Sequence, residues 1–172
     1  MFCVCKASDL QIQNVSRTNE KITFLQFSIQ FPKVKISIFP FKITPLDAGS
    51  LQKMEDYVKA EPKVLECSNF LLNTPYEENN LNRLSAMQYV LKWMEGTDYT
   101  FSIDSKAAEL TDGNNDLFGL YVTTMPKVVL ENKGTKLSDD EIHNRVVELL
   151  IAYCKNEKNN MKPTKKLKKL MK

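Results

Sequence analysis

Three carboxylates and a tyrosine lie together just after the single tryptophan of the chain. Glu95, Asp98 and Asp104 surround Tyr99 in the segment EGTDYTFSID. Paired carboxylates can perform acid–base chemistry when a cleft holds them at a defined separation and the pKa of one of them is raised. One hypothesis is therefore an enzyme of unknown type that uses these groups. The alternative, which the polar surroundings favour, is a loop whose carboxylates are solvated.

Four aromatic residues around the same segment are the candidate binding residues of the chain, as the lining of a ligand groove: Tyr89, Trp93, Tyr99 and Phe101. Tyr89 and Trp93 are four residues apart and therefore share one side of a helix. Large aromatic side chains at this spacing are also typical of a hydrophobic core. We expect Trp93 to be buried, and exposed aromatics here would instead indicate a groove.

The histidine and cysteine residues of the sequence give little support to a metal site or a catalytic thiol. His143 is the only histidine, which excludes a histidine-rich metal site. Cys154 follows it on the same predicted helix, about 16 Å away along the axis at ~1.5 Å per residue, so the two cannot form a catalytic dyad. Cys67 and Cys154 occur in apolar helical patterns, which predicts buried free thiols. The pair Cys3 and Cys5 has no second pair at zinc spacing.

Three other motifs are incomplete. Ser50–Lys53 matches S-x-x-K, but the S-D-N and K-T-G elements of such acyl-enzymes do not occur. The segment 112–116, DGNND, lacks the spacing and the closing glutamate of a calcium loop. The five glycines form no phosphate-binding cluster. We therefore expect no catalytic residues, no metal site and no cofactor.

Charge is distributed unevenly along the chain. Residues 1–154 carry 16 Lys/Arg against 20 Asp/Glu, and residues 155–172 carry 8 Lys against one Glu. A basic end on an acidic body allows weak, charge-driven binding of polyanions, although a solvated helix end is the commoner outcome. Nucleic acid is an unlikely partner, because the segment lacks the arginines and aromatics that usually contact bases. The lysines concerned are Lys162, Lys165, Lys166, Lys168, Lys169 and Lys172.

The hydrophobic pattern predicts two kinds of element. Residues 9–43 alternate apolar and polar side chains, for example in FSIQF and VKISI, which predicts a small β ribbon. After Pro45 the period changes to that of helices. Ser50 is expected to cap a helix through Ala60, and Pro62 to stand in the first turn of a second helix.

The later helices follow with short connections. The clearest covers about 80–95, with two apolar stripes and Gly96 as its cap, so we expect it at the centre of a bundle. A short helix is expected at SKAAEL after Asp104, and another over 116–132 that Pro126 should kink or split. Ser138 to Glu141 matches a capping box and opens the last long helix. Thr164 is expected to cap a short basic helix.

Residues 45–172 resemble uncharacterised, largely helical bacterial proteins, often exported, for which no activity is established. The strings that carry the resemblance are KVLECSNFLLNTP (63–75), NNLNRLSAMQYVLKWMEGTDYTFSID (79–104), DLFGLYV (116–122) and LLIAYCKNEKNNMKPTKKLKKL (149–170). The resemblance implies a helical architecture and a periplasmic or secreted location. The start MFCVCKAS is either the remnant of an export signal or an ordinary first strand, and the latter implies a cytoplasmic protein.

The sequence therefore predicts a mainly α fold, a compact bundle of five or six short helices with a small N-terminal β ribbon. We expect a β-like segment at 1–44, a helical domain at 45–160 and a basic C-terminal tail at 161–172. The leading functional hypothesis is a non-enzymatic helical module that binds a protein or peptide partner. No apolar stretch is long and clean enough for a transmembrane helix.

Overall fold

The computed structural model describes residues 51–172, which form a mainly helical domain. Six α-helices and one 3-10 turn occur in this part of the chain, and it contains no strand. The predicted helical bundle is thereby confirmed. The predicted β ribbon and the segment 1–44 lie outside the described residues. The first described helix begins at Met54 with Lys53 as its N-cap, so the helix start expected at Ser50 is wrong. The elements are α1 (Met54–Asn73), α2 (Leu81–Met94), α3 (Ser105–Leu110), α4 (Asn115–Glu131), α5 (Asp139–Lys155), η1 (Glu157–Asn159) and α6 (Lys165–Leu170).

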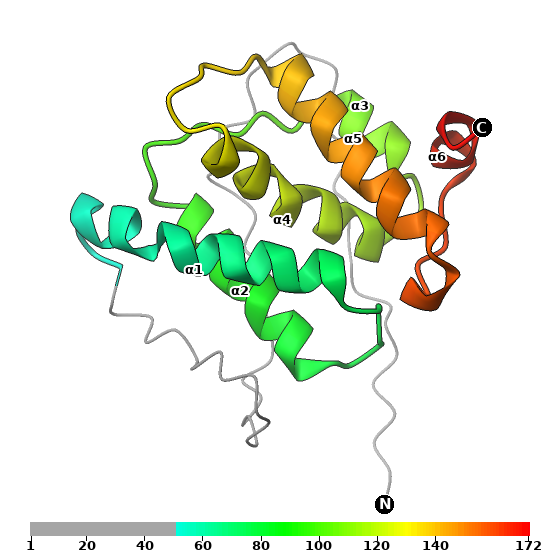
Figure 1. Ribbon diagram of the computed structural model, residues 1–172, viewed down its shortest axis with the longest axis horizontal. Helices are drawn as coiled ribbons and strands as arrows, with labels where there is room; N and C mark the ends of the chain where they lie inside the picture. The colour runs from blue at the N-terminus through cyan, green and yellow to red at the C-terminus, as the bar shows by residue number, and fades with distance from the viewer. Residues whose placement is uncertain (1–50) are drawn as a thin grey trace, which may run out of the picture.

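Helix α4 lies at the centre of the bundle. It packs against α1 on one side and α5 on the other, and it also contacts α2 and α3 (Figure 1). Its sequence explains this position, because apolar residues surround most of its circumference. Ten of its residues are buried, from Leu117 to Leu130. The helix around Trp93 was expected in this central role, but the principal neighbours of α2 are α1 and α4 only.

Both apolar stripes of α2 contribute to the core. Tyr89 and Trp93 are buried on one side, and Val90 and Met94 are buried on the other, where Leu84, Met87 and Leu91 are partly buried. Asn80 caps the helix by accepting hydrogen bonds from the backbone N–H groups of Asn82 and Arg83, at 3.0 and 3.1 Å. The helix predicted at 80–95 is therefore confirmed, and its aromatic side faces the interior.

Pro62 does not begin a new helix. Helix α1 runs unbroken from Met54 to Asn73 with Pro62 inside it, so the two helices expected here are one. A proline removes the hydrogen bond to the carbonyl four residues earlier, here that of Val58. Both Pro62 and Val58 are exposed, and water can therefore satisfy this carbonyl. Packing of α1 on α2 and α4 then keeps the helix continuous.

Pro126 likewise leaves α4 unsplit, as a single helix from Asn115 to Glu131. Ser68 of α1 donates its hydroxyl to the Thr123 carbonyl at 2.8 Å, in the turn that precedes the proline. The carbonyl that Pro126 leaves without a helical partner is that of Val122, four residues earlier, so the bond to Thr123 ties α1 to α4 beside this point.

The remaining helix starts agree with the sequence. Ser138 accepts a hydrogen bond from the backbone N–H of Glu141, whose carboxylate accepts one from the N–H of Ser138 in return. This is the predicted capping box. Asp104 is the N-cap of α3, and its carboxylate accepts hydrogen bonds from the backbone N–H groups of Lys106 and Ala107.

Gly96 follows the end of α2, but it does not adopt the left-handed conformation expected of a glycine cap. The glycines with positive φ in the described residues are Gly113 and Gly134, and Gly96 is not among them. A Cβ atom at Gly96 would lie 2.1 Å from the Tyr57 hydroxyl oxygen. The glycine is therefore required by the close approach of the Tyr57 ring from α1.

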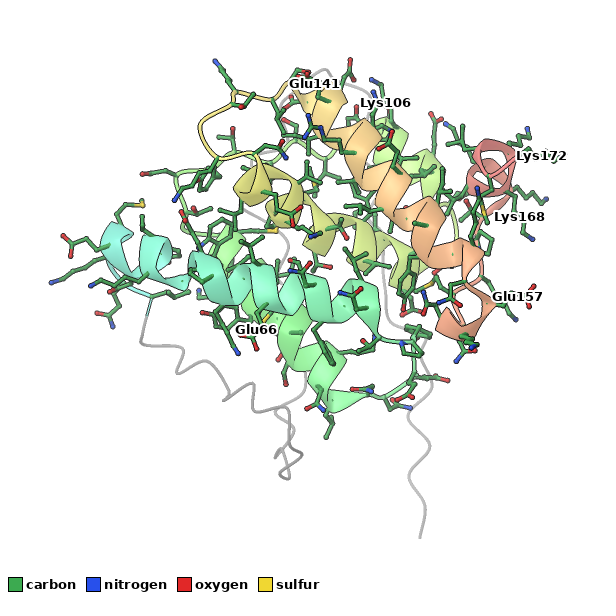
Figure 2. All side chains as sticks on the ribbon, viewed as in Figure 1. Glu66, Lys106, Glu141, Glu157, Lys168 and Lys172 are labelled. Carbon is green, nitrogen blue, oxygen red and sulfur yellow. The ribbon has the colours of Figure 1, made fainter. Side chains whose placement is uncertain are left out.

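The basic C-terminal segment packs on the bundle. Met161 is buried and Leu167 is fully buried, and α6 contacts α3. Figure 2 shows Lys168 of α6, and Lys172 just after this helix, at the outer edge of the molecule. Thr164 caps this helix, as predicted, by accepting a hydrogen bond from the backbone N–H of Leu167 at 3.2 Å. None of the helices in residues 51–172 has the length and apolarity needed to cross a bilayer.

Candidate functional site

Three of the four candidate aromatic residues form one packed group, which we call the Trp93 cluster: Trp93, Tyr99 and Phe101. The ring centroid of Trp93 lies 5.8 Å from that of Tyr99 and 6.2 Å from that of Phe101. Trp93 is 0% exposed, and its indole N–H donates to the Tyr57 carbonyl at 2.8 Å. Tyr99 and Phe101 cover it from the loop after α2 and are themselves partly buried. The expected burial of Trp93 is confirmed.

Tyr89 lies one turn before Trp93 and is also buried. Burial raises the pKa of its hydroxyl, and the nearby Cys67 and Glu66 raise it further. At the edge of the Trp93 cluster, Glu61 accepts a long hydrogen bond from the Tyr99 hydroxyl at 3.5 Å and forms an ion pair with Lys133. These side chains use their polar groups to hold the fold together.

The three candidate carboxylates have separate places in the structure. Glu95 forms an ion pair with Lys92 at 2.9 Å on the surface of α2. Asp104 caps α3, and Asp98 is exposed in the loop between the two helices. All three are exposed, and two of them already have structural roles. This arrangement favours the solvated loop over a shared acid–base site.

The histidine and the two described cysteines are also accounted for. His143 is partly exposed on α5, and its Nδ1 lies 2.9 Å from the hydroxyl oxygen of Tyr121. Cys67 and Cys154 are buried free thiols, and burial raises the pKa of each to about 11. Such thiols stay protonated near neutral pH and are poor nucleophiles. No group of three or more metal-ligating side chains occurs in residues 51–172.

A groove between α1 and α5 is the candidate site that the structure adds. It has a volume of about 420 Å³, which lies within the range of about 300–1,000 Å³ typical of ligand pockets. It is lined by Asn69, Leu72, Asn73, Lys127, Leu149, Ala152, Tyr153, Asn156 and Asn159. None of the residues predicted as binding residues is among them.

Helical spacing explains how these residues come to share a groove. The α1 wall presents Asn69, Leu72 and Asn73, at positions i, i+3 and i+4 of one helix face. The α5 wall likewise consists of residues at i, i+3, i+4 and i+7, from Leu149 to Asn156. Between the two walls lies Lys127 of α4, the helix against which both α1 and α5 pack. Figure 1 shows α1 and α5 on opposite sides of α4.

A buried hydrogen-bond network fixes the two walls at one end of the groove. Arg83 is buried, and its Nη1 donates to the carbonyls of Leu71 and Thr74, at 3.0 and 2.9 Å, at the end of α1. The Tyr153 hydroxyl of α5 donates to the same Thr74 carbonyl at 2.8 Å. The C-terminal carbonyls of a helix have no intrahelical partner, so these bonds both cap α1 and tie it to α5.

The amide groups along the groove retain hydrogen-bonding capacity. Lys127 donates to the Oδ1 atom of Asn69 at 2.7 Å, which leaves the Asn69 amide N–H groups available. The Oδ1 atom of Asn156 accepts from the backbone N–H of Lys158 at 3.2 Å, and its N–H groups are available too. The Asn73 side chain is exposed and has no hydrogen-bond partner among the described residues. The groove therefore offers neutral donors and acceptors.

Sequence reasoning did not identify this groove. An asparagine on a helix usually signals an exposed, polar face, and the asparagines come from α1, α5 and the turn after it. The one local signal is the pair Asn69 and Asn73, four residues apart at the end of a helix. Only the packing of α1 and α5 on α4 brings the others to the same place.

Comparisons with protein-family models, with curated proteins and with solved structures find no match for this chain. The resemblance to exported bacterial helical proteins therefore remains a prediction, and the assignment of function depends on the geometry of the described residues.

Proposed function

We propose that this protein is a non-enzymatic helical module that binds a protein or peptide partner, and that the groove between α1 and α5 holds an extended segment of that partner. The observation that carries the proposal is the pair of asparagines, Asn69 and Asn73, on one wall of a groove of about 420 Å³. Opposite them stands a further amide, that of Asn156.

The spacing of the asparagine pair suits an extended backbone. Positions four apart on a helix are about 6 Å apart along its axis. An extended chain repeats every two residues, at about 6.6–6.8 Å, and presents equivalent peptide groups to the same side. Asn69 and Asn73 can therefore bond to successive peptide groups on one side of such a segment. Because a side-chain amide both donates and accepts, it matches the N–H and C=O groups of a peptide.

The remaining lining indicates which side chains the segment carries. Leu72, Leu149 and Ala152 supply apolar surface beside the amides. The single charged residue of the lining, Lys127, forms an ion pair with Glu131 of its own helix. A groove with neutral polar groups and apolar walls favours an uncharged segment with an apolar residue that packs between Leu72 and Leu149. Recognition of the backbone then provides much of the affinity, as in other modes of extended-peptide binding.

A peptide library tests the proposal directly. Random peptides displayed on phage are selected on the full chain, and the enriched peptides are synthesised and titrated by fluorescence anisotropy. The blocking variant is Ala152→Trp, because Ala152 is exposed and lines the groove. The matched control is Ala108→Trp, an exposed alanine on α3 outside the lining.

We expect enriched peptides with apolar, uncharged centres, whose affinity falls at least about tenfold, or roughly 1.4 kcal/mol, in Ala152→Trp and stays unchanged in Ala108→Trp. Replacement of backbone N–H groups by N-methyl groups in the peptide should weaken binding as well. The proposal is wrong if no peptide is enriched, or if both tryptophan variants bind the enriched peptides as well as the parent chain.

A further inference from the structure

Four exposed lysines lie on or directly after α6. Lys165, Lys168 and Lys169 occupy positions i, i+3 and i+4 on one face of this helix, and Lys172 follows its end at Leu170. Leu167 points the other way and is 0% exposed, so these four lysines, which we call the lysine stripe, face away from the core.

The segment that carries the lysine stripe is held in place by specific contacts. The Thr164 hydroxyl donates to the Leu110 carbonyl at 2.5 Å, and the Asn114 amide donates to the Lys162 carbonyl at 2.8 Å. Lys166, which lies beside the stripe, forms an ion pair with Glu109 of α3. The stripe is therefore a surface of defined shape.

The charges of the stripe are not compensated within the described residues. None of its four lysines forms an ion pair there, in contrast to Lys166. Lys168 and Lys169 lie in the last turn, where the helix dipole favours a cation, but Lys165 lies in the first turn, where the dipole opposes it. Lys165 also repels Lys168 and Lys169, three and four residues away. A helix with this local conflict indicates a role outside its own folding, because binding of an anionic surface would remove the repulsion.

We propose that the lysine stripe of α6 docks the protein onto an anionic membrane surface through lipid phosphates and carboxylates. Clusters of four to eight basic residues on an amphipathic helix are typical of binding to anionic lipids. Residues 155–172 contain no arginine and no aromatic residue, so the surface lacks the groups that read or stack nucleic acid bases. The apolar side of α6 is buried against the bundle, and the attachment is consequently electrostatic and reversible.

The test is cosedimentation of the full chain with vesicles. Phosphatidylcholine vesicles with and without phosphatidylserine are compared at low and at physiological ionic strength. The test variant replaces the four lysines of the stripe by glutamine. The control variant makes the same change of net charge at four exposed lysines elsewhere, namely Lys53, Lys59, Lys136 and Lys155. Circular dichroism checks that both variants fold.

We expect binding only to the phosphatidylserine vesicles, and a decrease with salt. Each lysine near such a surface contributes about a fivefold factor, so the stripe variant should lose more than about 100-fold in affinity. The control variant should stay within about threefold of the parent, because its lysines do not touch the surface. Inorganic phosphate should compete no better than chloride at equal ionic strength.

Three results would overturn the proposal. One is an equal loss of vesicle binding in the stripe and control variants, which would indicate a response to net charge alone. Another is displacement by inorganic phosphate at low concentration, which would identify a site for a small anion. The third is stronger association with a DNA or RNA duplex than with the phosphatidylserine vesicles, which would assign the stripe to nucleic acid.

Discussion

The Trp93 cluster and the groove between α1 and α5 both contact α1, but they differ in whether their polar side-chain groups have hydrogen-bond partners. In the cluster the indole N–H of Trp93 is bonded to a backbone carbonyl, and the Tyr99 hydroxyl contacts Glu61. In the groove, the amide N–H groups of Asn69 and Asn156 are left over after the internal bonds are made. Buried polar groups in native proteins are almost always bonded, and every buried side-chain polar atom among the described residues has a partner.

This difference shows why aromatic content is a poor guide to a site in this protein. Aromatic side chains bury large areas and therefore contribute strongly to the hydrophobic core. Polar groups without a hydrogen-bond partner at the surface of a rigid framework are the better indicator of a binding site, and the groove contains such groups. The contrast can be tested, because the two regions should respond to mutation in opposite ways.

The largest effect is expected at the centre of the Trp93 cluster. Trp93→Ala should lower the free energy of unfolding by about 3–5 kcal/mol, because it removes a fully buried ring and leaves a cavity. Urea denaturation followed by far-ultraviolet circular dichroism measures it. As a control, Leu170→Ala, at a side chain that is 54% exposed, should change stability by no more than about 0.5 kcal/mol. A loss below about 1 kcal/mol in Trp93→Ala would mean that the cluster is not a core.

An intermediate effect is expected from pH, through a second buried aromatic residue. Burial, with a smaller contribution from the charge of Asp104, raises the pKa of Tyr121 from 10.0 to about 12. The unfolded chain therefore ionises this tyrosine first, and the stability it contributes is complete below pH 10 and is lost as the pH rises towards 12.

At about pH 11 the loss from Tyr121 alone should be about 1.4 kcal/mol, equivalent to one pKa unit. Denaturation midpoints near pH 9 and near pH 11 measure it, in the parent chain and in Tyr121→Phe, which lacks the titrating group. If both chains lose the same stability between these pH values, the Tyr121 hydroxyl is not protected by the fold.

The smallest effect on stability is expected in the groove. Asn73→Ala should change the free energy of unfolding by no more than about 0.5 kcal/mol, since the side chain is exposed and has no partner in the described part of the chain. The same variant should weaken binding of a selected peptide about threefold to tenfold, the usual contribution of one hydrogen bond. Thermal unfolding and anisotropy titration separate the two quantities. If Asn73→Ala lowered the free energy of unfolding strongly, Asn73 would be a structural residue, and the groove would not differ from the Trp93 cluster in its response to mutation.

Local signals predicted much of the helical framework. The capping box of Ser138 and Glu141 and the cap at Thr164 both occur where the sequence indicates. These motifs act within one turn of the chain, and distant residues do not change them. The new helix expected at Pro62 was wrong, and α4 is not split at Pro126, because packing against neighbouring helices keeps α1 and α4 continuous. The kink expected at Pro126 stays a prediction.

The groove could not be predicted in the same way. Asn69 lies in α1 and Asn156 follows the end of α5, 87 residues later in the sequence, and neither is distinctive in its own segment. Their meeting depends on the packing of α1 and α5 against α4, and on the anchoring of Thr74 by Arg83 and Tyr153. These are long-range contacts, for which one sequence contains no periodic signal.

The sequence alone therefore determined the helical class, the positions of most helix starts, the basic character of residues 155–172 and the burial of Trp93. These properties follow from composition, periodicity and capping, which are local. Only the tertiary structure decided which helix is central and where hydrogen-bonding groups remain unused. Those outcomes depend on how whole helix surfaces fit together, because each apolar face is buried only against another one.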